Sequence, residues 1–255
     1  MTAKINAAES IRGLACLAVV FSHLAMSFFP FLHHFDPTET TDLNWVYQVH
    51  HLPLGFLYSG DAAVFVFFVL SGYVLSYAIL KKPEQFQSRL KSMMVKRYPR
   101  LMIPALTSCL IIWATLSIID IDSRHVGLWL QAFAQQDFSF KTALYEGTIG
   151  AFLFSDSNIN WVLWTMTIEL MGSFVLFFLL VLYQWKHGVF WLGSVLVLVL
   201  AYMWRGQGFC MGIASFVIGI YIYLYAKQLS ACFAVLLLIL GLYLAGAHNT
   251  SQAYS

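Results

Sequence analysis

Residues 56–80 read FLYSGDAAVFVFFVLSGYVLSYAIL and carry a single charged side chain, Asp61. A bilayer core of roughly 30 Å is crossed by about 20 helical residues, so this run predicts a membrane-spanning helix. Its apolar residues are continuous, whereas the strands of a membrane barrel alternate apolar and polar residues. Lipid is therefore the solvent that decides the fold.

The rest of the chain is also rich in apolar residues. Of its 255 residues, 60% are hydrophobic and 10% are charged, and the mean hydropathy of +0.74 is too high for an ordinary soluble domain. We predict an all-α, polytopic transmembrane helix bundle of about seven spans, in one domain over residues 1–255. The predicted spans are 11–31, 56–80, 101–119, 161–183, 188–204, 208–226 and 230–247.

The connections between the spans predict an orientation. Lys and Arg collect in the connection 84–100, which we expect along the cytoplasmic surface, so the N-terminus is predicted to be cytoplasmic. The longer connection 120–160 is interrupted by Gly and Asn, and it is expected to hold an interfacial helix or a re-entrant segment around 144–154. The first apolar run lacks a clear cleavage site, so it is interpreted as a span rather than a signal peptide.

Charge and cysteine content exclude other classes of protein. A net charge of +2, spread around apolar runs, does not favour nucleic acid as a partner. The four cysteines all fall inside apolar runs and lack metal-ligand spacing, so we interpret them as packing residues and predict no metal site.

Arg12 and His23 form the first candidate constellation. Eleven helical residues are about three turns and leave the two side chains only about 20° out of register, some 16 Å apart. One helix face therefore presents a cation near the membrane surface and an imidazole deeper in the membrane, where ionisable groups often mark a site. The alternatives are a structural histidine bonded to a neighbouring helix and an arginine that simply reaches the interface.

Glu169 is the second candidate, and we predict that it lies about half-way across the membrane. A lone carboxylate there is costly, so it should be protonated or paired, with His23 or a basic residue as partner. The alternative is a structural clamp between helices. Trp164, nearby, is typical of an interfacial aromatic belt.

Arg97 and Arg100 are three residues apart and could form a fork for phosphate groups at the cytoplasmic surface. Attraction to anionic lipid also explains such a basic cluster. Pro99 suits the first turn of a helix that starts here, and Pro104 would bend it. In the preceding span, Ser71 and Gly72 allow close helix approach, and Asp61 is expected near the outer end.

Together these segments resemble the acyltransferase 3 family, integral membrane acyltransferases that modify bacterial surface glycans and some small molecules. The residues that carry the resemblance are Arg12-Gly13-Leu14-Ala15 with His23, Gly60-Asp61 through Ser71-Gly72-Tyr73, Arg97-x-x-Arg100 with Pro104, and Trp164 with Glu169. The resemblance covers roughly residues 8–220. Since members of this family usually have about ten spans, the chain is expected to lack the family's last helices.

The resemblance implies transfer of an acyl group, usually acetyl, from cytoplasmic acyl-CoA to a hydroxyl of a glycan or lipid-linked glycan. It implies no bound cofactor, with acyl-CoA as co-substrate, and a place in the bacterial inner membrane. The roles that it implies are His23 as the catalytic imidazole, Glu169 near the reacting groups, Arg12, Arg97 and Arg100 on the donor, and Asp61, Ser71 and Trp164 as further site candidates.

The chemistry of these residue types agrees with that activity, because imidazole is a suitable general base and paired arginines recognise phosphates. Whether His23 only removes the acceptor proton or also carries the acyl group stays open. Two other functions stay open as well. One is a proton-coupled transporter or flippase with a relay through His23 and Glu169, and the other is an inactive remnant.

Overall fold

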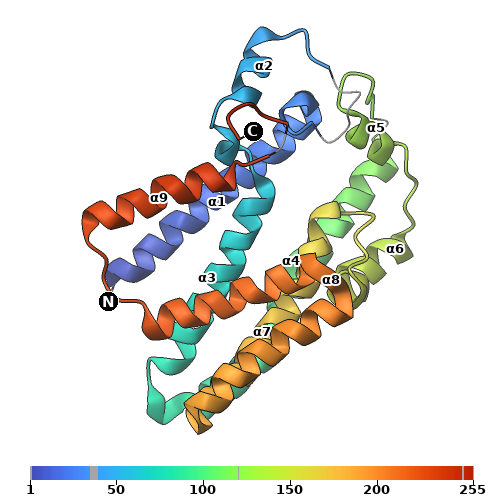
Figure 1. The fold of residues 1–255 in the computed structure, drawn as a ribbon. Helices are drawn as coiled ribbons and strands as arrows, with labels where there is room; N and C mark the ends of the chain where they lie inside the picture. Colours follow the sequence, from blue (N-terminus) through green and yellow to red (C-terminus); the bar gives the residue numbers. More distant parts are fainter. Residues whose placement is uncertain (1, 35–39, 120, 249, 255) are drawn as a thin grey trace. The chain divides into compact units, whose positions relative to one another are not determined.

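The computed structural model describes residues 2–34, 40–119, 121–248 and 250–254, with only the backbone for residues 2–5. Within these ranges every regular element is a helix, which confirms the all-α prediction. The α-helices (Figure 1) are α1 (Thr2–Phe28), α2 (Asn44–His51), α3 (Gly60–Leu80), α4 (Phe86–Ile118), α5 (Leu128–Ala134), α6 (Phe140–Tyr145), α7 (Thr165–Trp185), α8 (His187–Tyr225) and α9 (Ala231–Ala245).

Five of the described helices, α1, α3, α4, α7 and α8, are long and apolar enough to cross a membrane. α8 contains two of the predicted spans, 188–204 and 208–226. Gly206 separates them with a left-handed backbone conformation (φ 78°, ψ −165°) that favours glycine. Tyr221 on its second half donates to Ser194 on its first half at 3.2 Å, and Cys210 Sγ lies 3.4 Å from the Leu198 carbonyl oxygen. The halves therefore pair as an antiparallel hairpin, and with the shorter α9 the span count is near the predicted seven.

α4 corrects the predicted start of the third span. It begins at Phe86 and runs without interruption through Pro99 and Pro104, so the basic segment before residue 101 is part of a 33-residue helix. Each proline removes a backbone hydrogen bond, which normally ends a helix. In membrane proteins such helices persist because neighbouring groups satisfy the freed carbonyls.

Contacts beside Pro99 hold α4 in place. Tyr98 donates to the backbone carbonyl of Thr148 at 2.8 Å, and its ring packs edge-on against Phe152, with 5.4 Å between ring centroids. Both partners belong to the helical segment η4 (Glu146–Phe154), which has π-type hydrogen bonding and continues α6. The segment predicted around 144–154 is therefore helical, and it packs on α4.

The chain divides into two compact units, and each is described by itself. Unit 1 comprises Met1–Phe67, Ile121–Gln136 and Lys227–Ser255, and unit 2 comprises Phe68–Asp120 and Asp137–Ala226. α3 runs from the first unit into the second. The single domain expected from the sequence stays a prediction.

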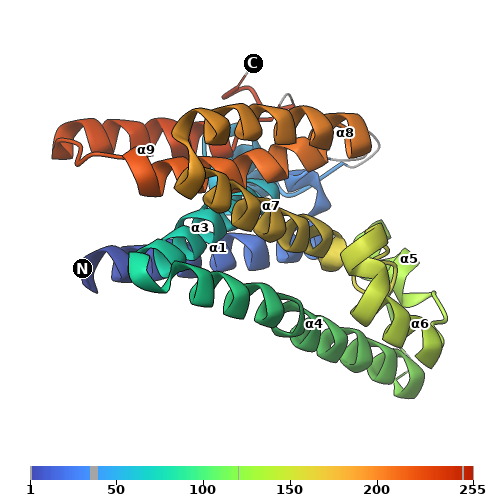
Figure 2. The same cartoon turned by 90° about the horizontal axis from the view of Figure 1, so that it is seen from below.

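The core of unit 2 forms where α7 and α8 lie side by side, as Figures 1 and 2 show. Gly172 of α7 faces the ring of Phe216, and Gly212 of α8 faces the side chain of Ile168. Small residues at these positions let the two helix backbones approach closely, as is typical of packing between membrane helices. A second buried cluster joins α4, α6, η4 and α7 through Ala105, Cys109, Ala143, Ala151, Phe152, Ile159, Leu163 and Leu170.

The contact between α3 and α8 leads to a first testable prediction. A Cβ on Gly219 would lie 2.7 Å from the backbone nitrogen of Tyr73 and 2.9 Å from Cα of Gly72, so the helices would have to separate. We expect Gly219→Ala to destabilise the protein by about 1–3 kcal/mol, the range typical of overpacking. Thermal unfolding in detergent measures this, with Gly208→Ala on the same helix as control, because a Cβ there meets no atom within 4 Å. Equal unfolding midpoints would contradict the prediction.

Unit 1 is held together by a small core and by the segment that follows α9. Ala25, Leu32, Val46 and Tyr58 form the buried core. The segment after α9 lies beside α2 in Figure 1, where the backbone nitrogen of Gln252 donates to Nδ1 of His51 at 3.3 Å. The segment after α9 therefore closes on α2, although the two bonded residues are 201 positions apart in the chain.

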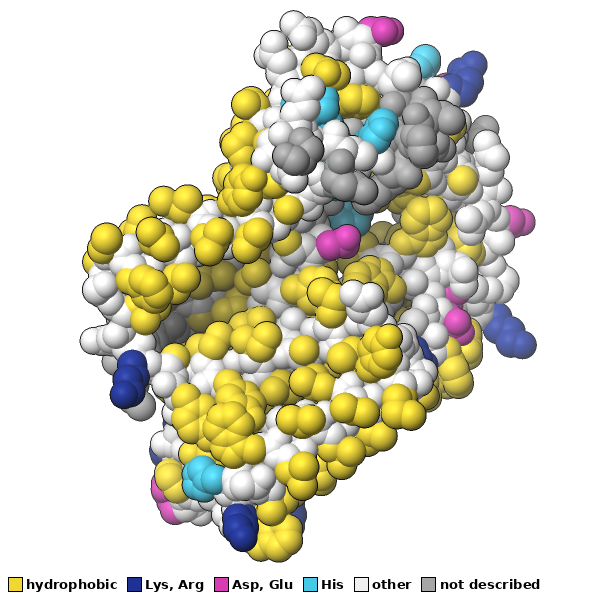
Figure 3. Space-filling model, in the orientation of Figure 1, with side chains coloured by type: hydrophobic (Ala, Val, Ile, Leu, Met, Phe, Trp, Pro, Cys, Tyr) yellow, Lys and Arg dark blue, Asp and Glu magenta, His cyan; other side chains and the backbone are white. Residues whose placement is uncertain are grey.

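The outer surface of the helices is apolar. Large hydrophobic side chains are exposed along α1, α4, α8 and α9, and Ile118 at the end of α4 is 82% exposed. Figure 3 shows hydrophobic side chains over most of the face that it draws, with few charged ones among them. Such a surface is stable in lipid and would aggregate in water, so the protein is an integral membrane protein.

Candidate functional site

A polar cluster in unit 2 joins three of the long helices. Arg97 of α4 forms an ion pair with Glu169 of α7, and its Nε donates to Ser173 Oγ at 2.7 Å. Ser71 of α3 donates to Glu169 Oε1 at 2.9 Å. The side chains of Arg97 and Glu169 are only 10% and 13% exposed. Each polar group therefore has a partner, as burial in an apolar bundle requires.

Helix geometry places these groups. Glu169 and Ser173 are four residues apart and share one face of α7, so one guanidinium can bond to both. Ser173 also donates to the backbone oxygen of Glu169 at 2.6 Å, which fixes its own hydroxyl. On α3, Gly72 directly follows Ser71 and packs on the backbone of α8 near Phe216. That close approach of α3 and α8 holds Ser71 in place.

The structure confirms that Glu169 is paired with a basic residue, and that residue is Arg97 rather than His23, which lies in the other unit. The structure does not bring Arg97 and Arg100 together as a fork. Arg97 is buried with Glu169, while Arg100 is exposed. Because α4 starts at Phe86, Arg97 lies about 16 Å along the helix rather than at its first turn.

Glu169 lies closer to the start of its span than predicted. It is the fifth residue of α7, and the apolar run that holds it is Trp161–Trp185, so it is about 12 Å from the start of that run. Trp164, in the short helix η5 (Trp161–Trp164), is 39% exposed. The structure thus brings Ser71, Arg97 and Glu169 together and does not bring Trp164 into their hydrogen bonds.

His23 in unit 1 has a defined tautomer. Its Nδ1 lies 2.8 Å from the carbonyl oxygen of Val19. A carbonyl can only accept, so Nδ1 carries the hydrogen and Nε2 of the neutral ring carries the lone pair. Among the described residues no hydrogen bond occupies Nε2. This is the arrangement that a general base needs.

The other two predicted residues of unit 1 lie on the surface of α1 and in the first turn of α3. Arg12 pairs with Glu9 at 3.0 Å on the surface of α1, where both side chains are well exposed. An exposed pair of this kind is weak, so the guanidinium can exchange partners readily. Asp61 is exposed in the first turn of α3. The glycine before it is required by space, because a Cβ on Gly60 would lie 2.7 Å from Ser22 Oγ, next to His23.

The comparison with protein families agrees with this geometry. A family model described as an acyltransferase domain matches residues 5–251, which is nearly the whole chain. The chain belongs to the acyltransferase 3 family. Comparison with curated proteins and with solved structures finds no match. Membership makes this a membrane protein of an acyltransferase family, with an acyl donor and an acceptor as its implied partners.

Several polar residues of this acyltransferase 3 domain were not predicted from its sequence. Ser173 is recognisable only in hindsight, four residues after Glu169. Glu146 is 2% exposed and accepts from the Asn158 side chain at 2.8 Å and from the Ile159 backbone at 2.9 Å. This carboxylate therefore closes the loop that leads into α7. The signal that could have indicated it is an acidic residue inside an apolar segment.

His33 was missed as well. It lies just after η1 (Pro30–Leu32), with its Nε2 3.0 Å from the Ser22 carbonyl oxygen, directly before His23 in sequence. Burial lowers the pKa of His33, against the hydrogen bond to Ser22 and the charge of Asp61, which raise it, while His23 and His248 add to the lowering. His23 and Asp61 are therefore both within electrostatic reach of His33.

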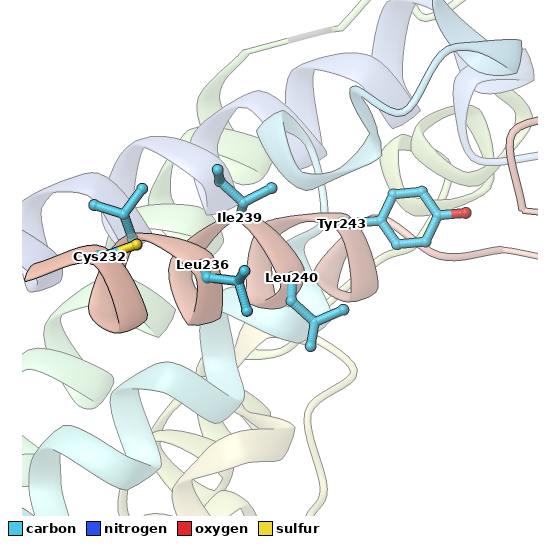
Figure 4. Close-up of a pocket in the computed structure, with 6 residues that line it drawn as sticks. Cys232, Leu236, Ile239, Leu240 and Tyr243 are labelled. Carbon is cyan, nitrogen blue, oxygen red and sulfur yellow. The ribbon is translucent and has the colours of Figure 1, made fainter. Parts of the chain in front are cut away.

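The acyltransferase 3 domain also has a cavity whose side chains offer no reactive chemistry. A cavity of about 520 Å³ runs along α9 (Figure 4) and is lined by Cys232, Val235, Leu236, Ile239, Leu240 and Tyr243. Its lining is apolar apart from one thiol and one hydroxyl, so it suits lipid contact rather than acyl transfer. In the part of the chain that the structure describes, no group of three or more His, Cys, Asp or Glu side chains could hold a metal ion.

Proposed function

We propose that the protein is a membrane-bound O-acyltransferase that moves an acyl group, most simply acetyl, from cytoplasmic acyl-CoA to a hydroxyl of a glycan or lipid-linked glycan. The observation that carries the proposal is the tautomer of His23, whose Nδ1–H is held by Val19 so that Nε2 is a base. An imidazole is suited to this task because its ordinary pKa is near neutral pH.

In the proposed reaction, Nε2 of His23 accepts the proton of the acceptor hydroxyl as its oxygen attacks the thioester carbonyl. The carbon–sulfur bond breaks, and the proton passes to the departing thiolate to give free CoA. Attack by the histidine itself, followed by transfer to the acceptor, balances equally well and uses the same nitrogen. Both routes make His23 the catalytic residue.

The arginines divide into two roles in this proposal. Arg100 is exposed and the side chain of Arg12 is 39% exposed, and both carry fixed charge, which suits the phosphates of CoA. Arg97 instead holds Glu169 and Ser173, so it positions the carboxylate that the family resemblance places near the reacting groups. The excess of Lys and Arg in the segment 81–100 supports an N-terminus in the cytoplasm, where acyl-CoA is found. The proposed place in a bacterial inner membrane rests on the family resemblance.

The experiment that tests the proposal compares two donors, acetyl-CoA and the phosphate-free acetyl-pantetheine. Wild-type protein in liposomes is expected to release thiol from both in the presence of a glycan acceptor, with a higher kcat/KM for acetyl-CoA. Arg100→Ala should raise the KM for acetyl-CoA about 10-fold and leave acetyl-pantetheine unaffected, because one charge-assisted phosphate contact contributes roughly one power of ten in binding.

The matched control is Arg124→Ala, an exposed arginine already bonded to Asp122, which should change neither donor's KM. Absence of thiol release from folded wild-type protein would refute the proposed activity. The transporter alternative predicts pH-driven uptake without consumption of CoA. A relay through Glu169 is less favoured by the contacts of that residue, because its carboxylate is already engaged by Arg97 and Ser71.

A further inference from the structure

At one end of unit 1, buried polar atoms lack partners. Tyr58 Oη, His34 Nδ1, His248 Nε2 and Tyr254 Oη are all shielded from solvent, and no hydrogen bond reaches them within the described residues. Tyr58 as a whole is only 8% exposed. Unpaired buried polar groups are rare in folded proteins, and each one needs an explanation.

These atoms belong to one continuous group of rings. His50 is the centre, with its ring centroid 4.7 Å from His248 and 5.9 Å from His34. The ring of Tyr254 lies 5.5 Å from that of His248. The ring of Tyr58 packs edge-on against His33, the residue before His34, with 5.6 Å between ring centroids. We call Tyr58, His34, His50, His248 and Tyr254 the ring cluster.

Figure 3 shows several histidine side chains gathered around the part of unit 1 that holds α2.

The unpaired hydrogen-bonding atoms of the ring cluster are of two kinds. His248 Nδ1 lies 2.8 Å from the carbonyl oxygen of Gly246, so Nδ1 donates there and Nε2 of the neutral ring can only accept. The hydroxyls of Tyr58 and Tyr254 can each donate and accept. A ligand hydroxyl also donates one hydrogen bond and accepts others, so several neighbouring hydroxyls would satisfy this set. Flat rings beside them offer the faces on which the C–H groups of a sugar pack.

The ring cluster favours a neutral ligand over an anion. Burial raises the pKa of Tyr58 to about 12, so its hydroxyl keeps its proton near neutral pH. Burial lowers the pKa of His50, in opposition to its contacts with the carbonyl oxygens of Leu32 and Thr250, and neighbouring His248 and His51 lower it further. The charge of Asp61 raises the pKa of the adjacent His33. The cluster therefore presents hydrogen-bonding groups with little positive charge.

The backbone at the ring cluster is strained. His34 has a φ of 48°, in the left-handed region that residues other than glycine seldom adopt. Such strain persists only where surrounding contacts impose it, and it is found preferentially at binding sites. His34 directly follows His33, whose Nε2 contacts the Ser22 carbonyl oxygen next to His23. Through this contact the ring cluster adjoins the turn of α1 that carries the proposed base.

We propose that the ring cluster binds the acyl acceptor as a neutral, hydroxyl-rich ligand, a sugar ring, through Tyr58, His248 and Tyr254. The choice of the acyl acceptor as ligand rests on the proposed function, because an O-acyltransferase must hold a hydroxyl compound near its base. It adds the place of binding and the groups that recognise the acceptor. The contacts that the sugar would make are those that the buried atoms lack within the protein.

The test uses the full chain in nanodiscs without acetyl-CoA, so that binding is measured apart from catalysis. Glucose, rhamnose and N-acetylglucosamine serve as probes, and saturation-transfer NMR reports their contact with the protein. Tyr58→Phe removes one hydroxyl and keeps the ring. We expect at least one sugar to bind the wild type, and Tyr58→Phe to weaken that binding about 10-fold, the loss of one hydrogen bond.

Tyr47→Phe is the matched control, because Tyr47 lies on α2, stacks on Phe31 and is exposed; its sugar affinity should equal that of the wild type. If the Tyr58 hydroxyl is only an unpaired buried group, Tyr58→Phe will raise the thermal unfolding midpoint and leave sugar binding unchanged, which overturns the proposal. Failure of all three sugars to bind folded wild-type protein overturns it too.

The same variants in the acyl-transfer assay separate this proposal from the proposed function. Tyr58→Phe is expected to raise the KM for the acceptor about 10-fold and leave the KM for acetyl-CoA unchanged. Sugar binding that depends on Tyr58, without any acyl transfer, would support the site and refute the proposed function. Acyl transfer with an acceptor KM that Tyr58→Phe leaves unchanged would refute the site and support the function.

Discussion

His23→Ala is expected to slow acyl transfer by about 100- to 10,000-fold, the usual contribution of a general base. The variant removes Nε2, the atom that the Val19 hydrogen bond leaves with its lone pair. The KM for acetyl-CoA should change little, because the imidazole acts on the acceptor proton rather than on the donor's phosphates. The measurement is kcat for thiol release by purified protein in liposomes.

A matched control separates chemistry from folding. His125 is exposed in the connection before α5 and has no place in the proposed reaction, so His125→Ala should keep wild-type kcat. Both variants should unfold at the wild-type temperature, since His23 makes its side-chain hydrogen bond within its own helix. A His23→Ala enzyme with kcat within a factor of two of the wild type would refute the assigned role.

Arg97→Leu is expected to destabilise the protein by about 3–5 kcal/mol, because it leaves the carboxylate of Glu169 buried without its cation. The effect should be smaller in the double variant Arg97→Leu/Glu169→Leu, in which no charge is left unpaired. The double variant therefore reports the coupling of the two side chains rather than the size of either one. Chemical or thermal unfolding in detergent measures all three proteins.

Arg100→Leu controls for the loss of an arginine from the same helix. Arg100 is exposed, so its substitution should change stability by less than about 0.5 kcal/mol, as is usual for surface positions away from special contacts. The pairing of Arg97 with Glu169 would be contradicted if Arg97→Leu and Arg100→Leu unfolded alike, or if the double variant were less stable than Arg97→Leu.

The spans were predictable because each one is a long apolar run, and lipid leaves the backbone no alternative to a helix. The turn between residues 204 and 208 was predictable for a local reason, since Gly206 adopts the left-handed backbone that separates the halves of α8. The start of α4 was not predictable from local rules. Pro99 is typical of a first helical turn, yet tertiary contacts such as Tyr98 with Thr148 hold the helix through it.

The site was predictable in its residue types and less so in its pairings. An apolar span makes Glu169 conspicuous and requires a partner, but spacing alone could not choose between His23 and Arg97. The different surroundings of Arg97 and Arg100 were not predictable, because their three-residue spacing fixes their angle on the helix and says nothing about which side is buried. His33 and the ring cluster lie in short connections, where no periodic pattern indicates which side chains meet.

The proposed acyl transfer by His23 is tested most directly by following the acyl group itself. Inside-out membranes with wild-type protein or His23→Ala receive acetyl-CoA radiolabelled on the acetyl group, and both free CoA and label in the glycan fraction are measured. We expect equimolar CoA release and glycan labelling in the wild type, and neither above background in His23→Ala. Equal labelling by the two proteins, or no labelling by folded wild-type protein, would contradict it.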